Sequence, residues 1–497
     1  MNFPRWPLRV LRWSLVGVAG LGLLGGAFVA EENWRGKRAW REYAARCAAA
    51  GDPVDVFPAP SSLPPERNFM KTPLLDRLLF AKEGSEELKE FEKTLSSPAG
   101  GSGALQVWRM GGMIDLAAIG GIKVVEGADL KALRAAYLAG ADVIMAAHGQ
   151  VGVSAILEEL RQAVAARPES QVMRPVAINR SLPLNIPMSR FTVVQRLSIL
   201  LATDACAGMA NGHNDKAWSD TMVMARIARG FSDMPDACLV DAMIGAVLAN
   251  TSVQSCWEAG LRHVWSDAQW ALLQAELTKI APMRSLGRSM RAERAFVVNT
   301  LQDAPIEQIL APGAVWDDPL PWWAASLRVV AGWVQQNKIS AAESLRKRAA
   351  LLDRNGTSEF LAQLQQDGTR RLAARERVTP YDVIAPLSIS ADDKITDSTL
   401  VAENNIALAV TACALERCRL AHGGYPETLA ELVPAYLDAV PRDVIDGQPL
   451  RYRRLADGTF QLYSVGLNGT DDNGALSEWK TDEGRRTGDW CWPQPAK

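Results

Sequence analysis

The chain has 497 residues, of which 48% are hydrophobic and 22% are charged. This length is too great for one ordinary hydrophobic core and predicts two or three domains, while the composition excludes a disordered chain. The 54 Lys and Arg residues nearly balance the 56 Asp and Glu residues, so the formal net charge is -2. A balanced chain without a basic block lacks the electrostatic character of a nucleic-acid-binding protein, and we expect no nucleic-acid partner.

The first predicted element is an apolar segment, residues 13–30, which follows a cytoplasmic N-terminus of residues 1–12. Its eighteen residues carry no charge, and at about 1.5 Å per residue they span roughly 27 Å, close to the hydrocarbon thickness of a bilayer. Basic residues precede the segment and acidic residues follow it: Arg5, Arg9, Arg12, Glu31 and Glu32. The positive-inside rule therefore predicts a single-pass anchor in the inner (cytoplasmic) membrane, with the bulk of the chain in the periplasm.

A cleaved signal peptide is the alternative, because the segment is at the short end for a membrane span. Phe28 is too large for the outer small position of a typical cleavage site before Glu31, which favours an uncleaved anchor, although cleavage after Ala27 stays open. Trp13 and Trp34 flank the span, as interfacial aromatic residues do.

The next segments contain helices and flexible connections. Residues 31–98 read as a juxtamembrane helix followed by a proline-rich connector, and residues 99–190 as a mixed, partly helical segment in which Arg167-Pro168 ends a helix. The glycine pairs between residues 111 and 121 match neither the dinucleotide-binding pattern nor a P-loop, so no cofactor-binding residues are predicted.

Residues 191–375 predict an α-helical array of antiparallel hairpins. Apolar residues recur on one helical face before a polar turn at residues 211–215, a further helix covers residues 237–263, and Ser266 and Gln269 have the spacing of a capping box. No second copy occurs at a fixed period, which favours an irregular helical domain over a tetratricopeptide-like solenoid. Residues 376–401 read as a linker.

Catalytic motifs are missing from the sequence, and no catalytic residues are predicted. The four histidines (His148, His213, His263 and His422) are far apart, and neither HExxH nor GxSxG occurs. The seven cysteines form no CxxC pair; they are small buried side chains or, outside the cytoplasm, partners in longer-range disulfides. The sixteen tryptophans are dispersed, which favours core packing over a carbohydrate-binding surface.

The most specific signal lies in residues 402–480, which predict a small α+β domain before a tail of residues 481–497. A long helical run ends at Gly423-Gly424, a common left-handed cap. Two strands with alternating polarity follow, joined by Ala456-Asp457-Gly458, which is a good hairpin signal. The unit reads as one long helix packed on an antiparallel sheet, so the chain as a whole is mainly α.

This region resembles the C-terminal part of the major pseudopilins of type II secretion systems. The resemblance rests on RLAHGGYP, TLAELVPAYLDAVPRD, DGQPLRYR and FQLYSVGLNGTDD, and it covers about 15% of the chain. The family implies a calcium-binding loop after the last strand, here Leu467 to Asn473, with Asp471, Asp472, Ser464 and the Leu467 carbonyl as oxygen ligands. An ordinary surface turn without an ion is the alternative.

Two departures separate the chain from that family. The pseudopilin processing site is missing before the apolar segment, and about 370 residues separate this segment from the long helix. The overall layout resembles membrane-anchored proteins of planctomycetes and verrucomicrobia that offer no activity to transfer. We therefore expect a membrane-anchored extracytoplasmic scaffold with protein partners, associated with secretion or envelope machinery. The alternatives are an extracytoplasmic hydrolase with a carboxylate- or histidine-based site in the helical middle, and a ligand-binding sensor.

Overall fold

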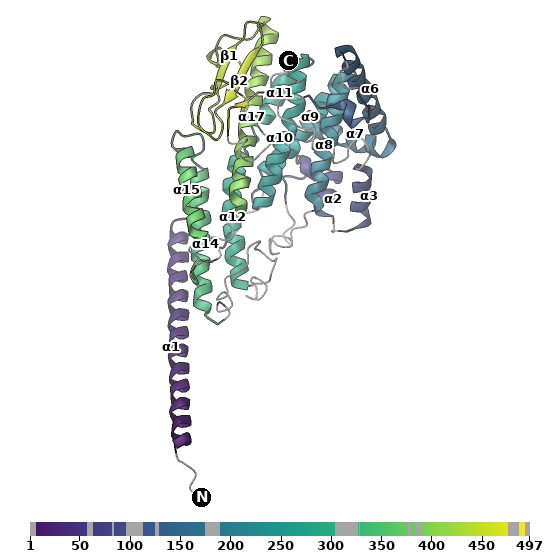
Figure 1. Cartoon of the computed structure of the whole chain (residues 1–497). Coiled ribbons are helices and arrows are strands. Elements are labelled where there is room, and N and C mark those ends of the chain that lie inside the picture. The colour runs from purple at the N-terminus through teal and green to yellow at the C-terminus, as the bar shows by residue number, and fades with distance from the viewer. Residues whose placement is uncertain are drawn as a thin grey trace.

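A computed structural model describes residues 6–56, 63–81, 84–95, 113–124, 129–173, 189–303, 327, 329–375, 379–383, 390–475 and 487–492. The described chain is mainly helical, with one small antiparallel sheet near the C-terminus (Figure 1). This confirms the predicted fold class at that level. Much of the proline-rich connector and of the segment 99–190 lies outside the described residues.

Helix α1 (Trp6–Ala49) is one continuous helix that joins the predicted apolar span to the predicted juxtamembrane helix. Figure 1 shows its N-terminal half projecting from the domain and its C-terminal half packed beside α14 (Ala331–Leu352). Apolar side chains along the projecting half are largely exposed: Trp13, Leu15, Val16, Val18, Leu21, Leu23, Leu24 and Phe28.

Three single helices in the described part of the chain are long and apolar enough to cross a membrane. The apolar window of the N-terminal one is 0% buried, whereas the windows in Phe191–Ala210 and Lys394–His422 are 83% and 78% buried inside the domain. The latter two segments therefore belong to the protein core, and the N-terminal helix is the candidate anchor.

The helical region has two parts. Its first part consists of η1 (Phe69–Lys71), α2 (Pro73–Phe80), α3 (Glu86–Leu95), α5 (Leu116–Ile119), α6 (Leu130–His148) and α7 (Val151–Ala166). Its second part consists of α8 (Ser189–Ala210), α9 (Asn214–Ser232), α10 (Leu239–Arg262), α11 (Asp267–Leu277), α12 (Pro282–Asp303), α14 and α15 (Phe360–Arg375). The helix end at Arg167-Pro168 and the capping box of Ser266 and Gln269 are confirmed. The predicted turn at residues 211–215 is present but shorter, because α9 already begins at Asn214.

The C-terminal region consists of α17 (Ser390–His422), η5 (Leu429–Leu432) and strands β1 (Arg451–Arg454), β2 (Phe460–Ser464) and β3 (Trp490–Cys491). The strands are antiparallel in the order β1-β2-β3, with Arg451 opposite Tyr463 and Tyr463 opposite Cys491. The predicted hairpin is confirmed, and Gly423 ends α17 with the expected positive φ of 79°. In Figure 1 the sheet lies at the end of the domain away from the free end of α1.

Two boundaries in this region differ from the predictions. Helix α17 begins at Ser390, within the predicted linker. The sequence pattern missed this start because the first turns are rich in polar residues, and two of the side chains that face the interior there are Thr396 and Thr399. The predicted tail contains β3, in which Trp490 and Cys491 are buried against β2. A strand of two residues has no periodicity for a sequence pattern to reveal.

The main hydrophobic core extends from Phe69 on η1 to Trp492 after β3 and includes side chains of α8, α9, α10 and α17. Helix α17 therefore belongs to both the helical region and the C-terminal sheet, since it contacts α10, α11 and β2. All seven cysteines are free; Cys47 is half-buried and the other six are buried.

Candidate functional site

The residues of the predicted calcium loop lie at and after the end of β2. Ser464 is the last residue of β2, and Leu467, Asp471 and Asp472 follow it. The buried Ser464 hydroxyl donates a hydrogen bond to Asp443 Oδ1 at 2.9 Å. Ser464 is therefore engaged with another carboxylate and does not point its oxygen toward the two aspartates as a free ligand.

The two aspartates of this loop accept hydrogen bonds from the protein. Asp471 Oδ1 accepts from the Tyr463 hydroxyl at 3.1 Å and from the Asn473 amide at 3.0 Å, and Asp472 Oδ2 accepts from the Asn468 side chain at 2.9 Å. The described residues contain no group of three or more His, Cys, Asp or Glu side chains that could hold a metal ion. The arrangement does not fit a ready-made calcium site, and the calcium loop stays a prediction.

A buried carboxylate that the sequence analysis did not single out, Asp443, organises the C-terminal sheet. Besides the Ser464 hydroxyl it accepts the amides of Ile445 and Val465 at 2.8 and 2.9 Å, and Arg451 donates to it at 2.9 Å. Burial raises the pKa of Asp443 to about 6. Since its donors come from β1, from the end of β2 and from the loop before β1, Asp443 fixes the sheet to the preceding loop.

The helical region contains a buried polar network formed by α6, α7, α8 and α9. His148 Nδ1 lies 2.8 Å from Asp204 Oδ1, and Arg161 donates to Asp204 at 2.6 Å and to both oxygens of Asp220 at 2.8 Å. The side chains of His148, Asp204 and Asp220 are 1%, 5% and 0% exposed. The sequence predicted only that His148 lies at a helix boundary, which is correct because it ends α6.

The electrostatics of this network are set by burial and by one arginine. Burial opposes ionisation of Asp204, but its hydrogen bond with His148 and the charge of Arg161 outweigh burial and lower its pKa. Burial raises the pKa of Asp220 well above its ordinary value, and the neighbouring Asp204 adds to that rise. A His oriented by a carboxylate is a component of general-base sites. Here, however, solvent does not reach it, so the network's evident role is to tie the helices together.

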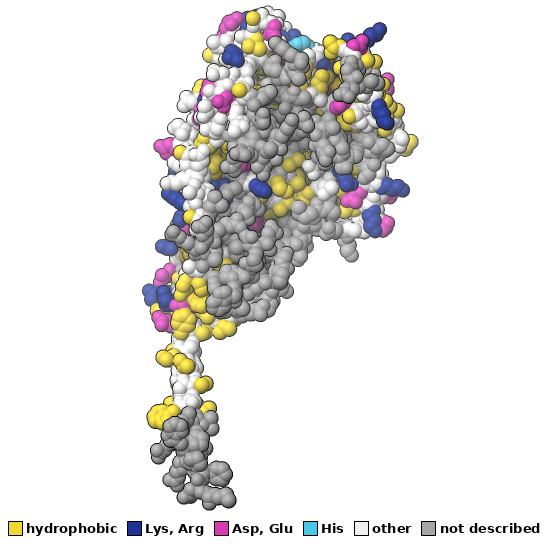
Figure 2. Space-filling view, in the orientation of Figure 1, with side chains coloured by type: hydrophobic (Ala, Val, Ile, Leu, Met, Phe, Trp, Pro, Cys, Tyr) yellow, Lys and Arg dark blue, Asp and Glu magenta, His cyan; other side chains and the backbone are white. Residues whose placement is uncertain are grey.

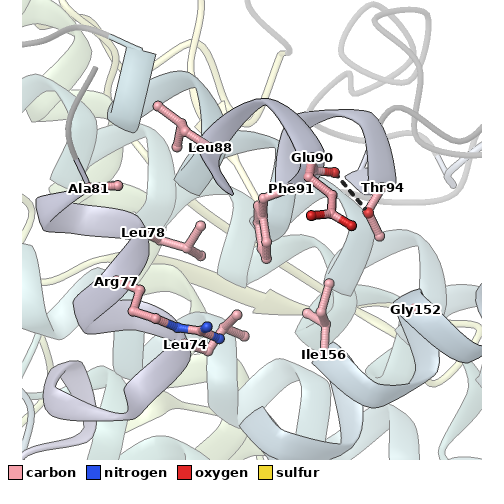
Figure 3. Close-up of a pocket in the computed structure, with 10 residues that line it drawn as sticks. All are labelled: Leu74, Arg77, Leu78, Ala81, Leu88, Glu90, Phe91, Thr94, Gly152 and Ile156. Carbon is pink, nitrogen blue, oxygen red and sulfur yellow. Dashed lines mark hydrogen bonds between the residues drawn. The ribbon is translucent and has the colours of Figure 1, made fainter. Parts of the chain in front are cut away.

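A cavity of about 210 Å³ lies between α2, α3 and α7 (Figure 3). The close-up shows Leu78, Phe91 and Ile156 pointing toward one another, with Arg77 and Glu90 at its edges. An apolar lining with two charged side chains at the edge provides no acid–base pair for catalysis. This cavity therefore does not support the predicted alternative of a hydrolase.

The junction between α1 and α14 lies next to the apolar span. Glu32 is 4% exposed; its carboxylate accepts hydrogen bonds from Trp333 Nε1 at 3.0 Å and from Arg35 at 2.8 Å. The side-chain oxygen of Asn33 accepts the backbone amide of Gly332 at 2.7 Å. This bond satisfies an amide in the first turn of α14 that has no partner within the helix.

Two glycines allow α1 and α14 to approach closely at this junction. A Cβ added to Gly36 would overlap the carbonyl oxygen of Gly332, and one added to Gly332 would overlap that of Glu32. Farther along, Lys338 Nζ lies 3.9 Å from the centre of the Trp40 ring. The contacts advance along both helices together, so α14 runs parallel to α1 and begins beside the end of the apolar span.

Comparison of the chain with protein-family models, with curated proteins and with solved structures finds no match. The resemblance to pseudopilins therefore stays a prediction from the quoted residues, and the geometry of the chain itself carries the functional argument.

Proposed function

We propose that this protein is a membrane-anchored extracytoplasmic scaffold that carries its domain in a fixed orientation to the bilayer. The continuity of α1 is the observation that carries this proposal. Its exposed apolar half has the length and composition of a membrane span, and its other half is packed into the domain without an intervening linker. A span joined rigidly to its domain restricts how the domain tilts and rotates on the membrane.

The partners in this proposal are the membrane and other envelope proteins. The sheet with the pseudopilin-like residues lies at the end of the domain away from the free end of α1 (Figure 1). A platform with this geometry presents the C-terminal region to proteins at a distance from the bilayer. The resemblance of that region to pseudopilins is the reason to expect secretion or envelope components among the partners.

Co-purification from membranes tests the scaffold proposal. The full chain carrying a C-terminal tag is cross-linked in cells, extracted in mild detergent and analysed for proteins in stoichiometric amounts. We expect a secretion or envelope component that is recovered with the full chain and lost when the exposed charges of the hairpin are reversed. Recovery of no such component would argue strongly against a scaffold.

An extracytoplasmic hydrolase is the second candidate, and the His148–Asp204 pair is the observation that favours it. His148 Nδ1 faces the carboxylate, while its buried Nε2 has no hydrogen-bond partner among the described residues. Because its side chain is only 1% exposed, His148 could act as a general base only in a conformation that opens a path to Nε2. Hydrolysis of ester, amide or glycoside substrates that is abolished by His148→Gln, without loss of folding, would establish this activity instead.

The calcium loop belongs to the same proposal, as an element that would stabilise the C-terminal sheet. Asp471 and Asp472 would supply carboxylates after exchanging their present donors, and the Leu467 carbonyl a further oxygen. Thermal unfolding with calcium and with chelator decides the matter. A bound ion is supported if chelator lowers the unfolding midpoint of the wild type but not that of Asp471→Asn. If chelator leaves the wild-type midpoint unchanged, structural calcium is excluded there.

A further inference from the structure

Aromatic side chains from three distant parts of the chain meet where α1 joins the domain. The rings of Phe28 and Trp333 lie 6.2 Å apart, edge to face, and those of Trp333 and Tyr381 lie 5.9 Å apart in the same geometry. Tyr381 follows α15 in the chain. Through these two ring contacts, α1, the first turn of α14 and residues 379–383 form one continuous aromatic surface.

The contact with Phe28 fixes the depth of this surface relative to a membrane. Phe28 lies within the apolar segment, about 3 Å before its last residue, Ala30, and Trp34 lies about 6 Å beyond that residue, at about 1.5 Å per residue. The polar headgroup region of a bilayer is about 5–8 Å thick on each side. Trp333 contacts Phe28 directly and therefore lies at the boundary between hydrocarbon and headgroups, and Tyr381 lies next to it.

The exposed side chains of this surface have the chemistry of a membrane interface. Val329 is 64% exposed, Phe28 49% and Tyr381 40%. Figure 2 shows hydrophobic side chains gathered where the narrow stalk of α1 meets the domain. Amphipathic rings are favoured at this boundary, and an exposed apolar patch in water is not.

We propose that the domain makes a second, peripheral contact with the bilayer through the surface of Val329, Trp333 and Tyr381. This inference rests on the proposed membrane span of α1. It adds that residues about 300 positions downstream insert into the interface, so the domain lies directly on the membrane instead of standing away from it. The packed Gly36–Gly332 contact and the Glu32–Trp333 hydrogen bond hold this surface at the level of the headgroups.

Fluorescence quenching in vesicles tests the proposal on the full chain. Six of the seven native cysteines are buried, so a Cys47→Ser background lets a bimane label react selectively with an introduced thiol. The test sites are Val329→Cys and Tyr381→Cys. The controls are Leu21→Cys in the apolar half of α1 and Val151→Cys on α7, which replace side chains that are 70% and 87% exposed. Vesicles of phosphatidylcholine and phosphatidylglycerol carry a nitroxide at a shallow acyl position for the labels at 329, 381 and 151 and at a deep acyl position for the label at 21, and iodide serves as the aqueous quencher.

The proposal predicts that labels at 329 and 381 lose emission to the lipid nitroxide and resist iodide, while the label at 151 does the reverse. It is overturned if the labels at 329 and 381 behave like the label at 151 while the label at 21 is quenched by lipid. If the label at 21 also escapes the lipid nitroxide, the membrane span itself is refuted and the scaffold proposal with it. Val329 makes no ring contact, so its label keeps the test valid if replacement of Tyr381 disturbs folding.

Discussion

The indole nitrogen of Trp333 donates a hydrogen bond of 3.0 Å to the carboxylate of Glu32, although 301 positions separate the two residues. Glu32 stands two residues after the apolar segment, and Trp333 stands in the first turn of α14. Because the carboxylate is buried and also pairs with Arg35, this bond connects the turn of α1 that follows its apolar half to the domain. The helix that is the candidate anchor is therefore continuous with the folded domain.

Replacement of Gly36 by Leu should open the contact between α1 and α14. The new side chain would overlap the backbone of Gly332, and overpacking of this kind costs about 1–3 kcal/mol. Gly26→Leu is the matched control, because a Cβ at that position meets nothing within 4 Å and the gain in helix propensity is the same. Thermal unfolding in detergent should show a lower midpoint for Gly36→Leu alone; equal midpoints would mean that α1 does not pack as described.

Trp333→Phe should weaken the same junction by removing one donor to Glu32. Loss of a hydrogen bond to a buried carboxylate lowers the free energy of unfolding by about 1–3 kcal/mol. Arg35 remains paired with Glu32 in this variant. Trp13→Phe provides the control, because Trp13 is 74% exposed and lies in the projecting half of α1. Denaturant unfolding should separate the two variants, and a loss of stability as large for Trp13→Phe would contradict this account.

Arg161→Met should be among the most destabilising substitutions in the helical region. It leaves Asp204 and Asp220 buried without their shared cation, and breaking such a pair costs about 3–5 kcal/mol. The double variant with Asp220→Asn should recover part of that loss, because it removes the buried acid that Arg161 pairs with. A double-mutant cycle by denaturant unfolding measures this coupling. Additive losses would show that the network does not act as a unit.

Glu403 on α17 should make stability depend on pH. Burial raises its pKa to about 6 from an ordinary value of 4.5, against the hydrogen bond that it accepts from the Met283 amide. The folded state therefore holds the proton more tightly than the unfolded state, and stability falls by about 2 kcal/mol as pH rises from about 4.5 to above 6. Glu403→Gln should remove this fall, so its unfolding free energy should exceed that of the wild type at pH 7.

The matched control for that experiment is Glu427→Gln. Glu427 is an exposed side chain paired with Arg454, and such surface pairs are worth about 0–1 kcal/mol. Unfolding free energies of all three proteins between pH 4 and pH 8 give the comparison. If the unfolding free energies of the wild type and of Glu403→Gln change in parallel across this range, Glu403 is not the source of the pH dependence.

Local patterns in the sequence were enough to predict several elements. The apolar segment, the Asp457-Gly458 hairpin, the Gly423 cap and the capping box of Ser266 each depend on residues close together in the chain, and the structure contains all four. Each of these signals is local because a turn, a cap or a span is defined by its own residues.

The contacts that give the structure its functional character are not local. The pairing of Glu32 with Trp333 and the meeting of His148 with Asp204 join residues that carry no recognisable spacing, so a sequence pattern could not connect them. The role of Asp443 was missed for the same reason, since its donors come from several segments. A glycine pair on α1 and α14 could have hinted at close helix packing, but the partner helix was unknown.

Membrane extraction combined with protease protection tests the central claim, that α1 anchors a periplasmic domain, most directly. Membranes from cells that produce the full chain are washed with alkaline carbonate, and intact spheroplasts are treated with protease. We predict that the chain stays in the membrane pellet with residues 1–30 present by intact mass, and that added protease digests the domain while the N-terminus survives. Release by carbonate, a mature chain without those thirty residues, or a domain protected in intact spheroplasts would contradict the claim.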